Sequence, residues 1–170
     1  MPLFEVTEDG LRRRPIAAFA ALGMYERADL QRLLRDDISA LDEDLLVVAE
    51  EYGNWEDARR RIDLLALDKA GRLVVIELKR TDDGGHMELQ ALRYAAMVSS
   101  MGFSEVADAL TAHRAKHGHA DDAGARAELA AFLDAPEAGE EPVISTDVRI
   151  VLVSADFGRE ITTTVLWLNG

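Results

Sequence analysis

The chain has 170 residues, enough for one domain with a hydrophobic core, and its 48% apolar and 30% charged residues form an ordinary globular mixture. It contains no run of about 20 apolar residues, the length that a bilayer-spanning helix needs, and its first ten residues lack the apolar stretch of a signal peptide. Because there is no cysteine, disulfides and thiolate metal sites are excluded, and a cytoplasmic location is expected.

The net charge of −13 argues against broad, sequence-independent coating of nucleic acid, which relies on Lys and Arg to neutralise phosphates. It is compatible with an acidic cluster that binds a metal ion and with basic contacts that are only local. The charge therefore restricts how a nucleic acid could be bound without excluding one.

A short hairpin is predicted at the N-terminus, over residues 1–15. Its two strands, 3–6 and 11–14, flank a turn that contains the Asp9-Gly10 step, a common turn sequence in hairpins.

From residue 26 onward, the spacing of apolar residues predicts an alternation of helices and strands. The elements are helix 26–38, strand 45–49, strands 61–67 and 72–79, helices 86–101, 104–117 and 124–134, strand 147–154 and helix 158–168. Helices before and after the strands would cover both faces of a mostly buried sheet, which defines an α/β fold. We expect a single domain over 1–170, with 103–142 as a helical insert.

The segment Asp68–Arg72 fits a three-residue hairpin loop whose glycine takes the left-handed conformation. This loop length fixes the register of strands 61–67 and 72–79, and it places Asp63 directly opposite Glu77 on one face. Lys79 follows two residues after Glu77 and so points to the same side. A loop one residue shorter or longer would put the two acids on opposite faces.

Both faces of this hairpin are expected to be buried, as in a central pair of strands. One face is wholly apolar; its residues are Ile62, Leu64, Ala66, Val74, Ile76 and Leu78. On the other face Asp63, Glu77 and Lys79 interrupt the apolar pattern together, at one end. A buried carboxylate is costly unless it is paired or binds a cation, and two adjacent carboxylates favour a hard divalent cation. The alternative is a salt bridge between Lys79 and one or both acids at a solvated strand end.

The sequence Arg61-Ile62-Asp63 followed by Val75-Ile76-Glu77-Leu78-Lys79-Arg80 resembles the PD-(D/E)xK nuclease motif, in particular NucS-like and RecB-like endonuclease domains. Ile62 stands where many members have a proline, although that proline is often missing in the superfamily. The resemblance covers about 26–168 and is strongest over 62–94. It implies a restriction-endonuclease-like core, in which helices flank a central mixed β-sheet in the order αβββαβ. It also implies a metal-dependent endonuclease that hydrolyses DNA phosphodiester bonds in repair, restriction or defence.

The resemblance also assigns roles to individual residues. In such nucleases the aspartate, the glutamate and the carbonyl after the glutamate bind Mg²⁺ or Mn²⁺, and here these groups are Asp63, Glu77 and the carbonyl of Leu78. Lys79 would activate the attacking water and stabilise charge on the phosphate. An acid on the first helix often completes the site, and Glu26 is the candidate; the alternative is a solvated carboxylate in the first turn of that helix.

Gln90 and Tyr94 match the QxxxY pattern of RecB-like and NucS-like members, and their spacing puts both side chains on one helix face. Gln90 would support the lysine or contact a phosphate, and Tyr94 would close the site. The alternative is a helix that packs Tyr94 into the core while Gln90 lies at a strand end.

Three arginines near the hairpin, Arg61, Arg80 and Arg93, are candidates for contacts with phosphate, against the alternative that they are simply solvated. His113 and His117 are spaced four residues apart, but no acid at suitable spacing completes a metal site with them. They are therefore expected to be surface residues.

DNA is the expected partner, with RNA left open, and no association with a membrane is expected. The second hypothesis is a catalytically weak nuclease-like module for nucleic-acid binding or assembly, which the acidic charge favours. NucS-like domains would place one more strand after the last helix, so three expectations stay open: a truncated form, a shorter variant, or a partner subunit or domain that supplies the missing element. The insert over 103–142 could cover the site or form the contact of a homodimer.

Overall fold

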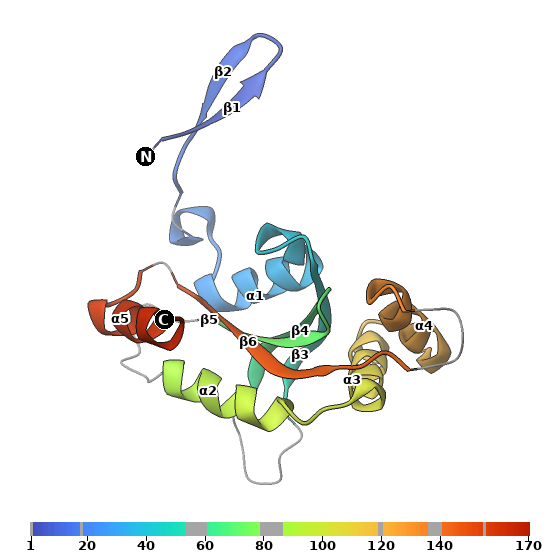
Figure 1. The fold of residues 1–170 in the computed structure, drawn as a ribbon. Helices are drawn as coiled ribbons and strands as arrows, with labels where there is room; N and C mark the ends of the chain where they lie inside the picture. Colours follow the sequence, from blue (N-terminus) through green and yellow to red (C-terminus); the bar gives the residue numbers. More distant parts are fainter. Residues whose placement is uncertain are drawn as a thin grey trace.

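The computed structural model describes residues 2–17, 19–53, 61–78, 87–118, 121–135, 141–154 and 156–170, with the backbone alone at 20, 26, 27, 87 and 122. The protein is an α/β structure in which helices flank a mixed four-stranded sheet (Figure 1). No helix of the described segments is long and apolar enough to cross a membrane.

All the predicted helices and strands are present. In chain order the elements are β1 Leu3–Thr7, β2 Gly10–Arg14, the 3-10 helix η1 Phe19–Leu22, α1 Glu26–Asp36, the 3-10 helix η2 Ile38–Ala40, β3 Leu45–Tyr52, β4 Ile62–Asp68, β5 Arg72–Leu78, α2 Met87–Val98, α3 Phe103–Lys116, α4 Asp122–Phe132, β6 Ser145–Val153 and α5 Arg159–Leu168. The strand predicted at 45–49 is longer than expected and continues to Tyr52, whereas the helix predicted over 26–38 ends at Asp36.

The strand order in the main sheet is β3-β4-β5-β6. The first three strands are antiparallel neighbours, and β6 runs parallel to β5. A parallel pair needs a long crossover, and here the chain between β5 and β6 contains α2, α3 and α4. The last two of these helices form the segment predicted as a helical insert.

The β4–β5 hairpin has the register that the three-residue loop predicts. Leu65 pairs with Val75, the N–H of Gly71 donates to the carbonyl of Asp68 at 3.0 Å, and Gly71 has a φ of 76°. A Cβ at this position would lie 3.0 Å from the carbonyl oxygen of Val143, so glycine is required both by the backbone conformation and by the space. The loop prediction is confirmed.

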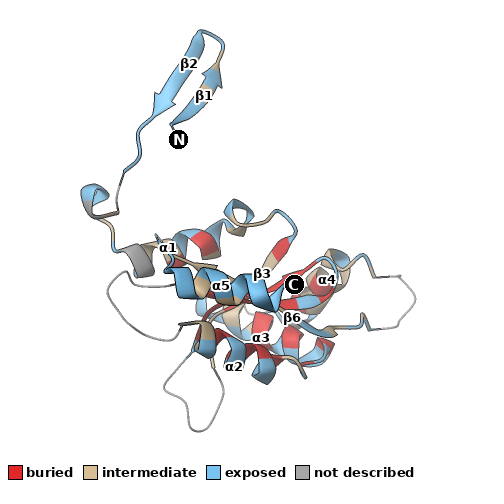
Figure 2. Cartoon of the chain, turned by 60° about the vertical axis from the view of Figure 1, so that its left-hand side comes forward, coloured by how far each residue is buried: buried red, intermediate tan, exposed pale blue. Residues whose placement is uncertain are grey.

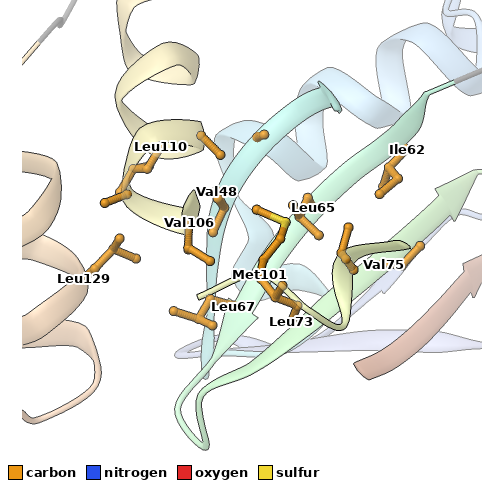
Figure 3. Packing of buried hydrophobic residues seen from close by; sticks show 14 of the residues in the cluster. Val48, Ile62, Leu65, Leu67, Leu73, Val75, Met101, Val106, Leu110 and Leu129 are labelled. Carbon is orange, nitrogen blue, oxygen red and sulfur yellow. The ribbon is translucent and has the colours of Figure 1, made fainter. Parts of the chain in front are cut away.

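Apolar side chains fill both faces of the sheet. The first cluster contains Leu65, Leu67, Leu73 and Val75 with Val106 of α3 and Leu129 of α4 (Figure 3). Val98 of α2 belongs to the same cluster. The second cluster contains Leu64, Ala66, Val74, Ile76 and Leu78 with Leu34 of α1. All of β4 is buried, so the prediction of a central pair of strands is confirmed.

One residue of the hairpin lies on a different face from the one predicted. Ile62 was expected beside Leu64, but it belongs to the first cluster, and its partner in β3, Tyr52, packs against the same cluster. The physical reason lies in β3, where a register shift occurs between Val47 and Ala49 and Glu51 has a φ of 51°. Such irregularities increase the local twist, and both strand ends turn toward the first cluster.

Helices α3 and α4 are part of the core. Phe103, Val106 and Leu110 of α3 and Leu129 of α4 are buried in the first cluster. At the hairpin loop, the Nζ of Lys69 donates to the carbonyl of Phe132 at 2.8 Å, which joins the loop to the end of α4. The segment over 103–142 therefore contributes to the same hydrophobic core as the sheet.

The N-terminal hairpin, β1 and β2, forms an arm that projects from the rest of the chain (Figures 1 and 2). Every residue of β2 is exposed, and Figure 2 shows the arm in the colour of exposed residues. Its pairing, from Thr7 opposite Gly10 to Leu3 opposite Arg14, confirms the predicted hairpin.

Candidate active site

Two carboxylates are buried at one end of the β4–β5 hairpin. The side chains of Asp63 and Glu77 belong to residues that are only 2% and 4% exposed. Continuing the register beyond the pair Leu64–Ile76 places Asp63 opposite Glu77, as predicted from the loop length. Directly opposed residues have Cβ atoms about 5 Å apart. The backbone therefore brings these two acids to the same end of the two central strands.

Asp63 also contacts the strand that contains Glu77. The backbone N–H of Leu78 donates to Oδ2 of Asp63 at 2.8 Å, so the carboxylate touches the peptide group that joins Glu77 to Leu78. A carboxylate that accepts a backbone N–H is held in one orientation by a charge-assisted hydrogen bond. This contact fixes one oxygen of Asp63 at the end of β5.

Glu77 is held from the opposite direction by helix α2. The Nε2 of Gln90 donates to Oε2 of Glu77 at 3.2 Å. Tyr94, one turn later in α2, is 4% exposed and belongs to the first cluster. The structure thus places Gln90 at a strand end and Tyr94 in the core, as the alternative for this pair describes, and it adds a direct contact between Gln90 and an acid of the site.

Several predicted residues lie elsewhere or outside the described residues. Lys79 and Arg80 lie outside the described residues, so the structure does not test their predicted roles. Glu26 begins α1, a helix whose Leu34 packs into the second cluster, on the sheet face opposite α2; the side chain of Glu26 also lies outside the described part. Arg61 and Arg93 are described and exposed.

A polar network at the same end of the sheet was missed in the sequence. Gln31 of α1 is 6% exposed, and its Nε2 donates to Oε1 of Glu50 at 3.2 Å and to Oε1 of Glu51 at 3.0 Å. Arg35 donates to the other oxygen of Glu50 at 3.0 Å. The pairs Glu50–Leu64 and Tyr52–Ile62 flank Glu51 and place it opposite Asp63.

The signal for this network was present in the sequence as two adjacent glutamates directly after the apolar run of β3, at the level of Asp63. Gln31 could have been found because it lies between Leu30 and Leu34 on the helix face that contacts the sheet. With this network included, helices on both faces of the sheet direct a glutamine amide toward acids at one sheet end: Gln31 toward Glu51, and Gln90 toward Glu77.

The two histidines predicted to be on the surface are close to this network. The rings of His113 and His117 are 4.9 Å apart, and Nε2 of His117 lies 3.8 Å from Oε2 of Glu50. Burial lowers the pKa of His113 below its ordinary value, and His117 lowers that pKa further. His117 is exposed as predicted, whereas His113 is partly buried.

The carboxylates of Asp63 and Glu77 have the chemistry of a site for a hard cation. Within the described segments, no group of three or more His, Asp or Glu side chains is arranged to hold a metal ion. Mg²⁺ does not need such a group, because it is usually bound through one or two carboxylates and keeps several waters or substrate oxygens as ligands. Two buried carboxylates at one strand end, Asp63 and Glu77, fit that mode of binding.

Comparison with known proteins identifies no relative: no family model matches the chain, and no curated protein and no solved structure matches it. The candidate site is therefore defined by its residues and their geometry.

Proposed function

We propose that the protein is a metal-dependent phosphodiesterase of the PD-(D/E)xK type that cleaves DNA. The observation that carries this proposal is the burial of Asp63 and Glu77, at 2% and 4% exposure, at the shared end of two central strands. In the sequence, Lys79 stands two positions after Glu77, where the nuclease motif has its lysine.

The topology supports the same proposal. The order α1-β3-β4-β5-α2-β6, with three antiparallel strands followed by a parallel one, agrees with the order αβββαβ that the resemblance implies for a restriction-endonuclease-like core. The contact between Gln90 and Glu77 adds support, because it connects the helix with the QxxxY pattern to an acid of the motif.

Asp63, Glu77 and the carbonyl of Leu78 would hold the metal ion. In an extended strand the N–H and the carbonyl of one residue point to the same side, and the N–H of Leu78 points to Asp63. A bound Mg²⁺ would polarise the phosphate and would lower the pKa of a water molecule bound to the metal. Lys79 would provide positive charge where negative charge grows on the phosphate, and Gln90 would keep Glu77 in place.

The strongly acidic chain limits how DNA would be bound. With a net charge of −13, contacts to phosphate would have to come from local groups, for which Arg61, Arg80 and Arg93 are the candidates. The same charge favours the second candidate function, a nuclease-like module that binds or assembles with little catalysis. RNA would serve the same chemistry as DNA, so both belong in the assay.

The test is cleavage of single-stranded, duplex and branched DNA, and of RNA, with Mg²⁺ or Mn²⁺, by the wild type and by Asp63→Asn, Glu77→Gln and Lys79→Ala. We expect each variant to cleave roughly a thousandfold more slowly than the wild type, because it loses several kcal/mol of metal-assisted stabilisation of the transition state. Glu43→Gln is the matched control, because it removes one negative charge from an exposed residue and should keep full activity.

Calorimetric titration with Mn²⁺ separates the two candidate functions. The nuclease is supported if the wild type both binds Mn²⁺ and cleaves nucleic acid, and if Asp63→Asn loses both properties. An absence of both metal binding and cleavage in the wild type would favour the module without catalysis. Cleavage that persists in all three variants would show that the site lies elsewhere.

A further inference from the structure

The arm formed by β1 and β2 has an apolar face that its own chain does not cover. The pairs Phe4–Arg13 and Val6–Leu11 place these four side chains on one face of the hairpin. Val6 is 82% exposed, Leu11 70% and Phe4 47%, and both overall views show the arm away from the other elements (Figures 1 and 2). An isolated two-stranded hairpin is at best marginally stable in water, so a cover for this face would stabilise it.

An apolar groove lies between β6, α2 and α5. It encloses about 810 Å³. Its apolar lining includes Leu92 of α2, Ile150 and Leu152 of β6, Phe157, and Ile161 and Val165 of α5. The strand β6 is the last in its sheet, and α5 contains no buried residue, with Leu166 69% exposed and Trp167 79% exposed. Contiguous exposed apolar residues of this kind mark interaction surfaces.

The charges of the arm and the groove are complementary. Residues 2–17 contain three acidic and three basic residues, so the whole net charge of −13 belongs to the rest of the chain. The only charged residue on the apolar face of the arm is Arg13. Asp147 of β6 lines the groove, and the two arginines of its lining are engaged in ion pairs with acids outside it, Arg72 with Asp68 and Arg149 with Asp42.

We propose that two copies of this chain form a symmetric dimer in which the arm of each copy lies in the groove of the other. The apolar face of the arm would cover the apolar residues of the groove, and Arg13 would face Asp147. Each copy has one arm and one groove, so a two-fold axis satisfies both surfaces at once and closes the assembly. This proposal concerns assembly and does not depend on the proposed nuclease activity.

The absence of cysteine in the chain makes a clean cross-linking test possible. Protein with Val6→Cys is mixed with protein with Val165→Cys under mild oxidation, and the products are separated without reductant. We expect a disulfide-linked pair of the two different variants. Ala112→Cys, at an exposed position of α3 outside the groove, is the matched control and should cross-link to Val6→Cys poorly.

Sedimentation of the full-length chain gives the second measurement. We expect twice the chain mass for the wild type and a dissociation constant at least ten times higher for Val6→Asp and for Arg13→Glu. Lys116→Glu, a charge change of the same size and sign as Arg13→Glu at an exposed position of α3, should leave the dissociation constant unchanged. Circular dichroism checks that each variant stays folded, which is expected because Val6 and Arg13 are outside both core clusters.

Four outcomes would overturn the proposal. The first is a wild-type chain that stays monomeric at its highest soluble concentration. The second is a dimer in which Val6→Cys links only to another Val6→Cys, which would mean that the arms meet each other. The third is a disulfide that forms within one chain when Val6→Cys and Val165→Cys are combined in the same protein, without any mixed dimer of the single variants, which would mean that the arm folds back. The fourth is a change in DNA binding by Arg13→Glu with the mass of the dimer unaffected.

Discussion

The backbone N–H of Leu78 donates to the carboxylate of Asp63 at 2.8 Å, at the point where the ladder between β4 and β5 has passed its last pair, Leu64–Ile76. In a regular antiparallel ladder the main chain of Ile62 would accept this bond. Here the side chain of Asp63 accepts the N–H of Leu78, so this residue joins the ends of the two strands in addition to its proposed role in metal binding. The two roles can be separated by the choice of substitution.

Asp63→Asn keeps an oxygen that can accept the N–H of Leu78, whereas Asp63→Ala does not. We expect the first variant to be nearly as stable as the wild type and the second to lose about 1–3 kcal/mol, the cost of a buried donor without a partner. Urea denaturation measures the stability, and Mn²⁺ titration measures the loss of metal binding expected in both. Equal stability of the two variants would mean that the bond to Leu78 contributes nothing.

Gln90 and Gln31 allow a matched comparison, because each donates its amide to glutamate at the same end of the sheet from opposite faces. Gln90→Leu removes the contact that orients Glu77, and losses of this kind lower metal affinity or activity by roughly 10–100-fold. Gln31→Leu should lower the free energy of unfolding through loss of its bonds to Glu50 and Glu51, with a smaller effect on cleavage. The measurements are kcat, KM and thermal unfolding. An equal loss of kcat in both variants would contradict the positioning role of Gln90.

Gly71 sets the register on which the candidate site depends. Gly71→Ala introduces a Cβ at a φ of 76° and at 3.0 Å from a carbonyl oxygen, so we expect a loss of about 1–3 kcal/mol together with reduced cleavage. Gly10→Ala is the control, because Gly10 also has a positive φ but meets nothing within 4 Å and lies in the arm. Its effect on core stability, measured by urea denaturation, should be much smaller. Similar losses in both variants would argue against the role assigned to the β4–β5 loop.

The local features of the hairpin could be predicted because they depend on few residues. A single glycine at the fourth position of Asp68–Arg72 determines the loop type, and the loop determines the register from Leu67–Leu73 to Leu64–Ile76. Continued by one pair, this register places Asp63 opposite Glu77. The apolar pattern of β4 and β5 was equally informative, since strands that are buried on both faces contain almost no polar residue.

Features that depend on tertiary contacts could not be predicted in this way. Ile62 lies in the first cluster because β3 is irregular around Val48 and because Glu51 has a positive φ. The alternation of apolar and polar residues along the sequence does not reveal either feature. The contacts of Gln31 with Glu50 and Glu51 join residues 19 and 20 positions apart, and only the packing of α1 against the sheet brings them together.

His113 should make the stability of the protein depend on pH. Its Nδ1 is buried with no hydrogen-bond partner among the described residues, and its pKa is lowered from 6.5, first by burial and then by His117, with Arg35 and Lys116 acting in the same direction and Glu50 opposing them. Because the folded-state pKa lies below the unfolded one, the unfolded chain binds more protons as the pH falls below 6.5. Stability is therefore lost from about pH 6.5 downward and is unaffected by this group at higher pH.

His113→Gln removes the titrating ring, so the fall in the free energy of unfolding between a pH above 6.5 and one about a unit below it should be smaller than in the wild type. His117→Gln removes only the lesser of the two main causes and should give an intermediate dependence. Urea denaturation of the three proteins at both pH values measures how much the free energy of unfolding changes with pH. The carboxylates are the same in all three proteins, so their contribution cancels when these changes are compared. An unchanged pH dependence in His113→Gln would show that other groups control it, whereas a larger one would mean that burial raises the pKa of this histidine instead of lowering it.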